Sequence, residues 1–245
     1  MSPFLDLAPA STLLVVVAHP DDEAFGCGSA LLLAGGAGVR TVVACATRGE
    51  AGEPAVPLGD ADLGDVREQE LRTSCAELGV DRVDVWAFAD SGMSGEPPAG
   101  SLAGTPADQL AQAVRRAVAG VAPDALLTLD ATDGHRDHAA VRRATERVGR
   151  ELDLPTYLSC LPRSLMARWA EHRASTGGGA AYRGLGELGT PDAEITHVLD
   201  AAAQVPRRER AMAAHASQAS PYAGLPDDLR RAFLDTVHLR LVQPG

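Results

Sequence analysis

Residues 13–23 read LLVVVAHPDDE. The first six positions, Leu13–Ala18, are apolar and rich in valine, which is typical of a strand buried on both faces of a parallel sheet. A histidine and three acids follow directly, at the point where such a strand would end. In open α/β sheets, binding sites lie at the carboxyl ends of the strands. This stretch therefore predicts a buried parallel strand with a polar site at its end.

The alternation of apolar runs and helix-period segments continues along most of the chain. Strands are predicted at Leu13–Ala18, Arg40–Ala46, Asp84–Phe88, Ala125–Leu129, Thr156–Cys160, Ile195–Leu199 and Thr236–Val242. Helices are predicted at Gly28–Ala34, Asp65–Leu78, Pro106–Val121, His138–Glu151, Arg163–His172 and Pro206–Ala216. Strands that alternate with helical crossovers indicate an α/β fold, a Rossmann-like, doubly wound and mostly parallel sheet with helices on both faces.

The length and composition suit one globular domain, because 45% of the 245 residues are hydrophobic and 22% are charged. We expect residues 1–245 to form a single domain in which residues 175–245 make a C-terminal cap. The glycine-rich segment Ser175–Gly189 is the best candidate for a linker before this cap. Two polar, turn-rich stretches, Gly49–Gly64 and Ser91–Thr105, follow predicted strands and are expected to form loops over the site.

The charge balance excludes several classes of function. The chain has 22 cations against 33 acids, a net charge of -11, so it has no basic field to neutralise phosphates. This argues against nucleic acid and anionic membranes as partners. All the cations are arginine, and the lack of lysine excludes Schiff-base, phosphate-loop and Ser-Lys chemistry.

Cysteine usage and the first residues predict the compartment. The four cysteines lie far apart without a Cys-x-x-Cys pair, which favours buried thiols in a reducing environment. The apolar run Leu13–Ala18 is too short for a membrane span or a signal core, and no cation precedes Arg40. We therefore expect a cytoplasmic protein. No surface patch specifies an assembly, so a homo-oligomer stays open.

The acids after the first strand indicate a metal site. Imidazole and carboxylate together are the ligands of Zn²⁺ and other divalent first-row metals, and a catalytic site uses about three of them. Pro20 restricts the turn so that alternate side chains converge, and we select His19 and Asp22 as ligands, with Asp21 beside the metal. The third ligand is expected from residues 135–138, His-Arg-Asp-His, after a second predicted strand. One of its rings would bind metal while the other faces the substrate.

A purely structural interpretation of the two motifs is that each is a polar cluster that caps a helix. This would be reasonable for either motif alone. Two other classes fail on detail. A dinucleotide-binding loop would need a third glycine where Leu31 stands, and acids occupy the place of the pyrophosphate. A serine hydrolase would need Gly-x-Ser-x-Gly, which the sequence lacks. A non-catalytic metal-binding protein remains an alternative, although it would have no need for Asp21 and His135.

The two motifs together, residues 19–23 and 135–138, resemble the signature of the PIG-L/LmbE-like family of zinc-dependent N-acetylglucosaminide deacetylases. The resemblance covers nearly the whole chain. Further parts of it are Thr47–Glu50, Val66–Leu71 and His215–Gln218. The tract Asp90–Met93 is similar to one found in the branch that includes the mycothiol-pathway deacetylase and the mycothiol S-conjugate amidase.

The residue chemistry and the resemblance imply the same mechanism. One Zn²⁺ held by His19, Asp22 and His138 would lower the pKa of water toward about 7 and polarise an amide carbonyl. Fe²⁺ also fits these ligand types. Asp21, adjacent but not ligating, would accept the proton of the water as general base.

Further roles are expected on the substrate side. His135 would stabilise the oxyanion and protonate the departing amine, while Asp137 holds one of its ring nitrogens and favours the imidazolium. Alternatively, Asp137 caps its helix. On the resemblance alone, Arg67 and Asp90 would grip glucosamine hydroxyls.

Some positions depart from the family or have two interpretations. Asp133 stands where the mycothiol-pathway enzymes carry a tyrosine, and Arg136 where proline is usual. Glu23 either supports a metal ligand from behind or pairs with an arginine. His215 matches the family motif, or it packs against Gln218 one helical turn away.

The sequence thus predicts an enzyme that removes the acetyl group from an N-acetylglucosamine-like amide. Its partner would be a small-molecule N-acylated amino sugar. The rival within catalysis is an amidase that cleaves a larger acyl group, such as a mycothiol S-conjugate or a glycosylated natural product. The metal ligands and the base would be identical in both, and only the pocket for the acyl group would differ.

Overall fold

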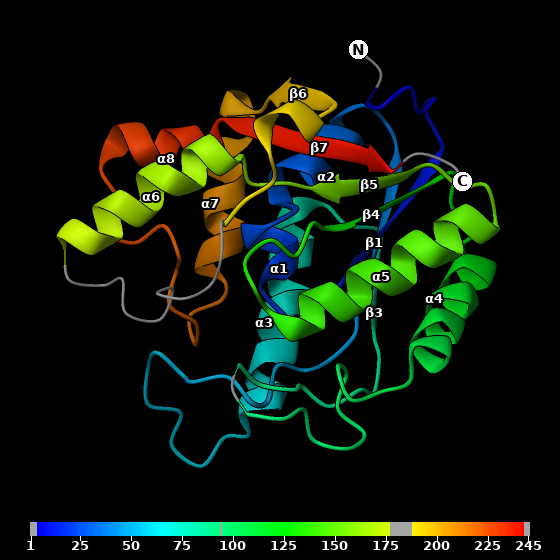
Figure 1. The fold of residues 1–245 in the computed structure, drawn as a ribbon, viewed down its shortest axis with the longest axis horizontal. Helices are drawn as coiled ribbons and strands as arrows, with labels where there is room; N and C mark the ends of the chain where they lie inside the picture. Colours follow the sequence, from blue (N-terminus) through cyan, green and yellow to red (C-terminus); the bar gives the residue numbers. More distant parts are fainter. Residues whose placement is uncertain (1–3, 94, 177–187, 243–245) are drawn as a thin grey trace.

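The computed structural model describes residues 4–93, 95–176 and 188–242. Its centre is a seven-stranded sheet in the order β3-β2-β1-β4-β5-β7-β6 (Figure 1). The strands are β1 (Thr12–Val17), β2 (Arg40–Cys45), β3 (Arg82–Val85), β4 (Ala125–Leu129), β5 (Thr156–Ser159), β6 (His197–Asp200) and β7 (Thr236–Val242). The first five strands in this order are parallel, and β7 runs antiparallel to both β5 and β6. The doubly wound, mostly parallel α/β fold predicted from the sequence is confirmed.

β1 is buried on both faces because every one of its side chains is apolar or small. Leu13, Val15 and Val17 pack into one hydrophobic cluster, whereas Leu14 and Val16 pack into a second cluster on the opposite face. This alternation follows from the two-residue period of a strand. The strand β1 therefore contributes side chains to the core on both faces of the sheet.

Helices cover both faces of the sheet. They are α1 (Asp22–Phe25), α2 (Gly28–Gly36), α3 (Leu63–Leu78), α4 (Ala107–Val121), α5 (Arg136–Glu151), α6 (Arg163–Ser175), α7 (Val205–Ala213) and α8 (Asp227–Leu234). The apolar faces of α4 and α5 contribute to one cluster, while α2, α3, α6, α7 and α8 contribute to the other. Figure 1 shows α4 and α5 side by side, and α6 next to α8.

Most predicted elements are found, with shifted ends. The third strand begins at Arg82 instead of Asp84, because its polar residues pair along β2 while the apolar Trp86 and Phe88 pack beyond the strand. Helix α8 was not predicted, although Pro226 precedes it and two acids fill its first turn, both common features of a helix start. The predicted linker Ser175–Gly189 lies largely outside the described residues.

The order of the strands indicates where a binding site should lie. From β1 the chain continues to β2 on one side, while β4 pairs with β1 on the other side. The carboxyl ends of β1 and β4 therefore flank the point where the winding reverses, which is where open α/β sheets bind ligands. Within the part of the chain that the structure describes, no helix has both the length and the apolar character needed to cross a membrane.

Candidate active site

The turn after β1 is held by its own acids. The carboxylate of Asp22 accepts hydrogen bonds from the backbone N–H groups of Ala18 (3.1 Å) and His19 (2.8 Å). Asp21 precedes α1 with φ of 112°, a conformation that non-glycine residues rarely adopt. Strain of this kind costs on the order of 1–3 kcal/mol and is concentrated at functional sites. The hydrogen bonds of Asp22 and the backbone conformation of Asp21 thus fix the shape of this turn.

The turn after β4 is organised by Asp133. One oxygen of its carboxylate accepts a hydrogen bond from the backbone N–H of His135 (2.9 Å), and the other lies 2.5 Å from Nδ1 of His138. His135 is the N-cap of α5, where its Nδ1 accepts a hydrogen bond from the backbone N–H of Asp137 (3.1 Å). The start of α5 therefore presents two imidazole rings to the end of β1, and these rings stack with centroids 4.7 Å apart.

Donor atoms from the two turns converge. Nδ1 of His19 lies 3.3 Å from Nε2 of His138. The two carboxylate oxygens of Asp22 face one ring each, with Oδ2 3.7 Å from Nδ1 of His19 and Oδ1 3.2 Å from Nε2 of His138. Tetrahedral ligands at about 2.1 Å from an ion are about 3.4 Å from one another. The three side chains therefore fit one divalent ion, and we call them the donor cluster.

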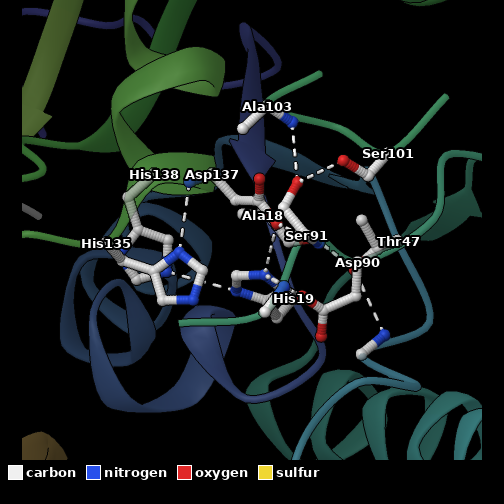
Figure 2. Close-up of polar contacts among 12 residues, drawn as sticks. Ala18, His19, Thr47, Asp90, Ser91, Ser101, Ala103, His135, Asp137 and His138 are labelled. Carbon is white, nitrogen blue, oxygen red and sulfur yellow. Dashed lines mark hydrogen bonds and ion pairs between the residues drawn. The ribbon is translucent and has the colours of Figure 1, made fainter. Parts of the chain in front are cut away.

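The second nitrogen of each donor ring faces a carboxylate. Nε2 of His19 lies 3.2 Å from Asp137, and Nδ1 of His138 lies 2.5 Å from Asp133. Metal-binding histidines almost always have such a partner, which fixes the tautomer and the orientation of the ring. Figure 2 shows the His19 ring between Asp90 on one side and His135 on the other.

Two other combinations of side chains bring donor atoms within 4.8 Å of one another. Among the described residues they are His19 with His135 and His138, and His19 with Asp90 and Asp137. The second combination uses the ring nitrogen of His19 that points away from Asp22. The contact of Nε2 of His19 with Asp137 leaves Nδ1 of His19 to converge with Nε2 of His138 on Asp22, which favours the donor cluster over the second combination. The first combination shares both rings with the donor cluster and has His135 in place of Asp22.

Asp21 is held next to the donor cluster by a buried arginine. Its carboxylate accepts a hydrogen bond from Arg67 (2.9 Å), which also donates to the backbone carbonyls of Pro20 and Gly49. Arg67 is 4% exposed, so it is no surface residue of α3. Gly49 has φ of 65°, and a Cβ at this position would overlap the guanidinium. The turn after β2 is therefore shaped to admit Arg67.

Glu23 supports the same turn from the other side. Its fully buried carboxylate accepts hydrogen bonds from the backbone N–H of Asp21 (2.9 Å) and the hydroxyl of Ser74 (2.5 Å). It also lies 2.6 Å from Nε2 of His215, which is buried as well. Of the two interpretations of Glu23, pairing with an arginine is wrong. The ring of His215 contacts this carboxylate, while the carbonyl of His215 accepts a hydrogen bond from the backbone N–H of Gln218 (3.0 Å).

Burial and mutual attraction shift the pKa values of the donors. Burial works against a charged imidazole, but hydrogen bonds with Asp137 and Asp90 outweigh it and raise the pKa of His19 to about 9. Burial likewise works against ionised Asp22, but His138 and His19 hold the pKa of that carboxyl well below its usual range. The carboxylates here therefore require positive charge, which a proton or a bound cation can supply.

The pKa values of Asp21 and His135, which lie beside the donor cluster, are shifted in opposite directions. Burial and the neighbouring Asp22 raise the pKa of Asp21 to about 7, although the charge of Arg67 works in the opposite direction. Burial and the nearby charge of His19 lower the pKa of His135 to about 4. His135 is therefore a neutral imidazole near neutral pH, and its Nδ1, which accepts a hydrogen bond, leaves the proton on Nε2.

The structure brings all the predicted site residues to this edge of the sheet, with two differences from expectation. The carboxylate of Asp137 contacts His19 and the backbone N–H of Ser91 (3.0 Å) instead of the His135 ring. His135 meets only the backbone of Asp137, so the predicted imidazolium is replaced by the neutral ring. The cause is the start of α5, where His135 itself is the N-cap and the Asp137 side chain turns toward β1.

Three supporting residues were not recognised in the sequence. Asp133 was considered only as a replacement for tyrosine, although its position five residues before a predicted ligand was a usable signal. Ser91 lies in the family-like tract Asp90–Met93 but was given no role of its own. Ser74 carried no signal, because it reaches the site through tertiary packing from a helix distant in sequence.

The class of protein now follows from comparison with known families. This chain belongs to the PIG-L family, whose model, described as GlcNAc-PI de-N-acetylase, matches residues 14–148. Among curated proteins it is 32% identical to a 1D-myo-inositol 2-acetamido-2-deoxy-alpha-D-glucopyranoside deacetylase from Acidothermus cellulolyticus, over 91% of this chain and 86% of the relative. A deacetylase of the same name from Geodermatophilus obscurus is 30% identical, over 97% and 94%.

Solved structures show the same fold. The zinc-inhibited form of teicoplanin deacetylase Orf2 superposes with a TM-score of 0.64 over 96% of this chain and 100% of that chain, at 17% identity. At this level of identity the likeness establishes the fold, and the chemistry must be argued from the residues.

Proposed function

We propose that this protein is a metal-dependent hydrolase that removes the acetyl group from an N-acetylglucosamine-like amide. The observation that carries the proposal is the donor cluster, three convergent donor atoms with the carboxylate of Asp21 beside them. The curated relatives support the substrate class, since both are named as deacetylases of an acetamido sugar. A non-catalytic metal protein would have no need for the strained, half-buried position of Asp21.

His19, Asp22 and His138 would hold one ion, Zn²⁺ or, with the same donor types, Fe²⁺. When bound, such an ion acidifies water and polarises an amide carbonyl. The nitrogen and oxygen donors of the cluster fit this requirement, and the carboxylates behind both rings keep those donors directed at one point.

Asp21 would act as the general base. Arg67 and the Glu23 carboxylate fix its side chain and its backbone N–H, so little motion remains to be lost when it accepts a proton from water. The proton that Asp21 accepts is the one that the departing nitrogen requires. Asp21 therefore connects the attack on the carbonyl with the release of the amine.

His135 would stabilise the oxyanion. Because its Nδ1 accepts from the backbone N–H of Asp137, its Nε2 carries a proton that it can donate to a developing negative charge. Asp137 serves both rings, His135 through its backbone and His19 through its carboxylate. Its catalytic contribution is to keep two rings in position.

Arg67 and Asp90 are our candidates for binding sugar hydroxyls. Asp90 lies on the far side of the His19 ring from His135, with a carboxylate oxygen 3.5 Å from Nε2 of His19 (Figure 2). Arg67 contacts Asp21 directly, so its grip on a sugar would be coupled to the position of the base. The sugar is therefore expected on the β2–β3 side of the donor cluster.

The decisive experiment measures release of primary amine by the zinc-reconstituted protein from a panel of N-acetylglucosaminides, including the inositol-linked one. We expect Asp21→Ala to keep its zinc and to lose about 10²–10⁴-fold in kcat. Asp60→Ala, an exposed loop acid, is the matched control and should be unaffected. If Asp21→Ala loses its zinc, Asp21 is a ligand; if no acetyl substrate releases amine with zinc bound, the proposed reaction is wrong.

His135→Ala separates the oxyanion role from metal binding. The variant should retain zinc, because the donor cluster does not include His135, while kcat falls by about 10²–10³-fold. Zinc content and kcat measured on the same preparation check both parts. Unchanged kcat would remove His135 from the mechanism.

A further inference from the structure

A cavity of about 260 Å³ opens beside the donor cluster, with Asp22 and His138 in its wall. It extends away from them between the ends of β4 and β5 and the helices α6 and α8, which lie side by side in Figure 1. Most of its lining is apolar. Large apolar side chains among the lining residues include Phe25, Leu129, Leu165, Met166, Trp169 and Phe233.

Three of the polar side chains in the wall of this cavity have partners within the protein. The hydroxyl of Ser159 donates to the backbone carbonyl of Gly26 (2.6 Å), and the hydroxyl of Tyr222 donates to that of Phe25 (2.8 Å). The guanidinium of Arg208 donates to the carbonyls of Ala24 and Phe25. A ligand in this space therefore meets mainly hydrocarbon surface and few groups that require a hydrogen bond.

The position of the cavity defines which part of a substrate it faces. The sheet order places the donor cluster, at the ends of β1 and β4, between two regions. Asp21, Arg67 and Asp90 lie toward β2 and β3, and none of them is among the described residues that line the cavity, which lies toward β5 and β7. With the amide carbonyl at the donor cluster and the sugar toward Asp90, the acyl chain enters the cavity.

We propose that the cavity lets the protein hydrolyse N-acyl glucosamines with linear aliphatic chains of up to about ten carbons as well as acetyl, and that it favours the longer chains. The inference rests on the proposed function and specifies its substrate class. A cavity of about 150 Å³ holds benzene, so about 260 Å³ accommodates on the order of ten carbon atoms. An acetyl methyl would leave most of this apolar volume unfilled. Each buried methylene contributes up to about fourfold in affinity.

Binding to metal-free protein tests the proposal without turnover. Trp169 lines the cavity, and Trp86 is the other tryptophan of the chain, so Trp86→Phe gives a single reporter. We expect the Kd of N-acyl glucosamines, read from Trp169 fluorescence, to fall on the order of a hundredfold or more from acetyl to octanoyl. A Kd that is flat or rises with chain length overturns the proposal.

Turnover by the zinc-loaded protein provides the second arm. kcat/KM should rise with the same chain lengths, and Ala232→Phe, which fills the cavity, should abolish the rise while acetyl turnover is retained. Ala167→Phe on the exposed face of α6 is the matched control and should behave like the parent. Acetyl turnover without any gain for longer chains overturns this inference and leaves the proposed function standing.

An alkyl group on the anomeric carbon is the competing source of hydrocarbon. Octyl N-acetylglucosaminide should gain little affinity, and Ala232→Phe should not change its Kd. If octyl N-acetylglucosaminide gains as much as the octanoyl amide and loses that gain in Ala232→Phe, the cavity accepts the aglycone and the acyl proposal is wrong. Absence of turnover for every substrate, with octanoyl binding intact, contradicts the proposed function and not the ligand class of the cavity.

Discussion

The two sides of the donor cluster differ in the kind of side chain that forms them. Toward α3, buried charged groups are joined by short hydrogen bonds, as in the contacts of Glu23 with Ser74 and His215 and of Arg67 with Asp21. Toward α6 and α8, the wall is hydrocarbon around an open volume, with Met166 and Trp169 among its residues. Both sides border the donor cluster, the apolar side through Asp22 and His138.

This difference separates two tasks. Directional hydrogen bonds in a low-dielectric interior hold a single geometry, which suits the placement of a proton-accepting carboxylate. Apolar surface makes no directional demand, so it tolerates ligands that differ in length. The charged side is therefore expected to set the chemistry and to be intolerant of change, whereas the apolar side sets selectivity and should tolerate conservative substitution.

The largest expected effect is the loss of stability when a buried carboxylate on the charged side is removed. Glu23→Ala leaves His215, Ser74 and the backbone N–H of Asp21 without their acceptor, and should lower the free energy of unfolding by about 3–5 kcal/mol. Met166→Leu on the apolar side conserves volume and should cost less than about 1.5 kcal/mol. Urea unfolding of both variants measures the contrast. Equal losses would show that the two sides are equally demanding.

A smaller effect is expected at the support of a donor ring. Asp133→Asn preserves the shape of the side chain but weakens its contact with Nδ1 of His138, so zinc affinity should fall about 10–100-fold. Competition with a chromophoric chelator gives the affinity. Asp153→Asn, an exposed acid at the end of α5, serves as control. An unchanged affinity would mean that Asp133 acts only on the helix start.

The smallest effect is a pair of pH dependences with opposite signs. Burial opposes protonation of His215, but Glu23 outweighs it and raises the pKa of His215. Its stabilising contribution is complete below the unfolded pKa of about 6.5 and is lost as the pH rises through the folded value. Burial lowers the pKa of His238 in the cavity wall, against a weaker effect of Asp192.

His238 should therefore contribute stability above pH of about 6.5 that is lost as the pH falls toward its lowered folded pKa. His215→Gln and His238→Gln should each remove the corresponding slope from a plot of unfolding free energy against pH. Slopes of the same sign for the two histidines would contradict the assignment of the two sides.

The sequence was informative wherever a few adjacent residues carry the information. Residues 13–18 specify a strand buried on both faces, and the motifs at 19–23 and 135–138 contain the whole donor cluster. Helix periodicity gave no sign that Arg67 is buried, because its burial depends on a glycine turn from another part of the chain. The contact between Glu23 and His215 joins positions 192 apart and left no local pattern.

The cavity was beyond prediction for the same reason. Its walls come from the packing of α6 against α8, and α8 itself was not predicted. Several expectations remain predictions from the sequence. They are the loops over the site, the C-terminal cap, the single domain and the cytoplasmic location. Local composition thus predicts which groups react, whereas the space available to a substrate depends on how distant helices meet.

The pairing of β1 with β4 has a consequence for how the protein comes into being. β1 aligns Leu13 with Ala125, and the rings of His19 and His138 are 119 positions apart. A growing chain that has joined β1 only to β2 carries two of the three donors and no closed place for an ion. Closing so long a loop is a slow, late step in folding. Under the proposed function, the ion would therefore be captured only after β1 has paired with β4, whether or not β5, β7 and β6 have joined the sheet.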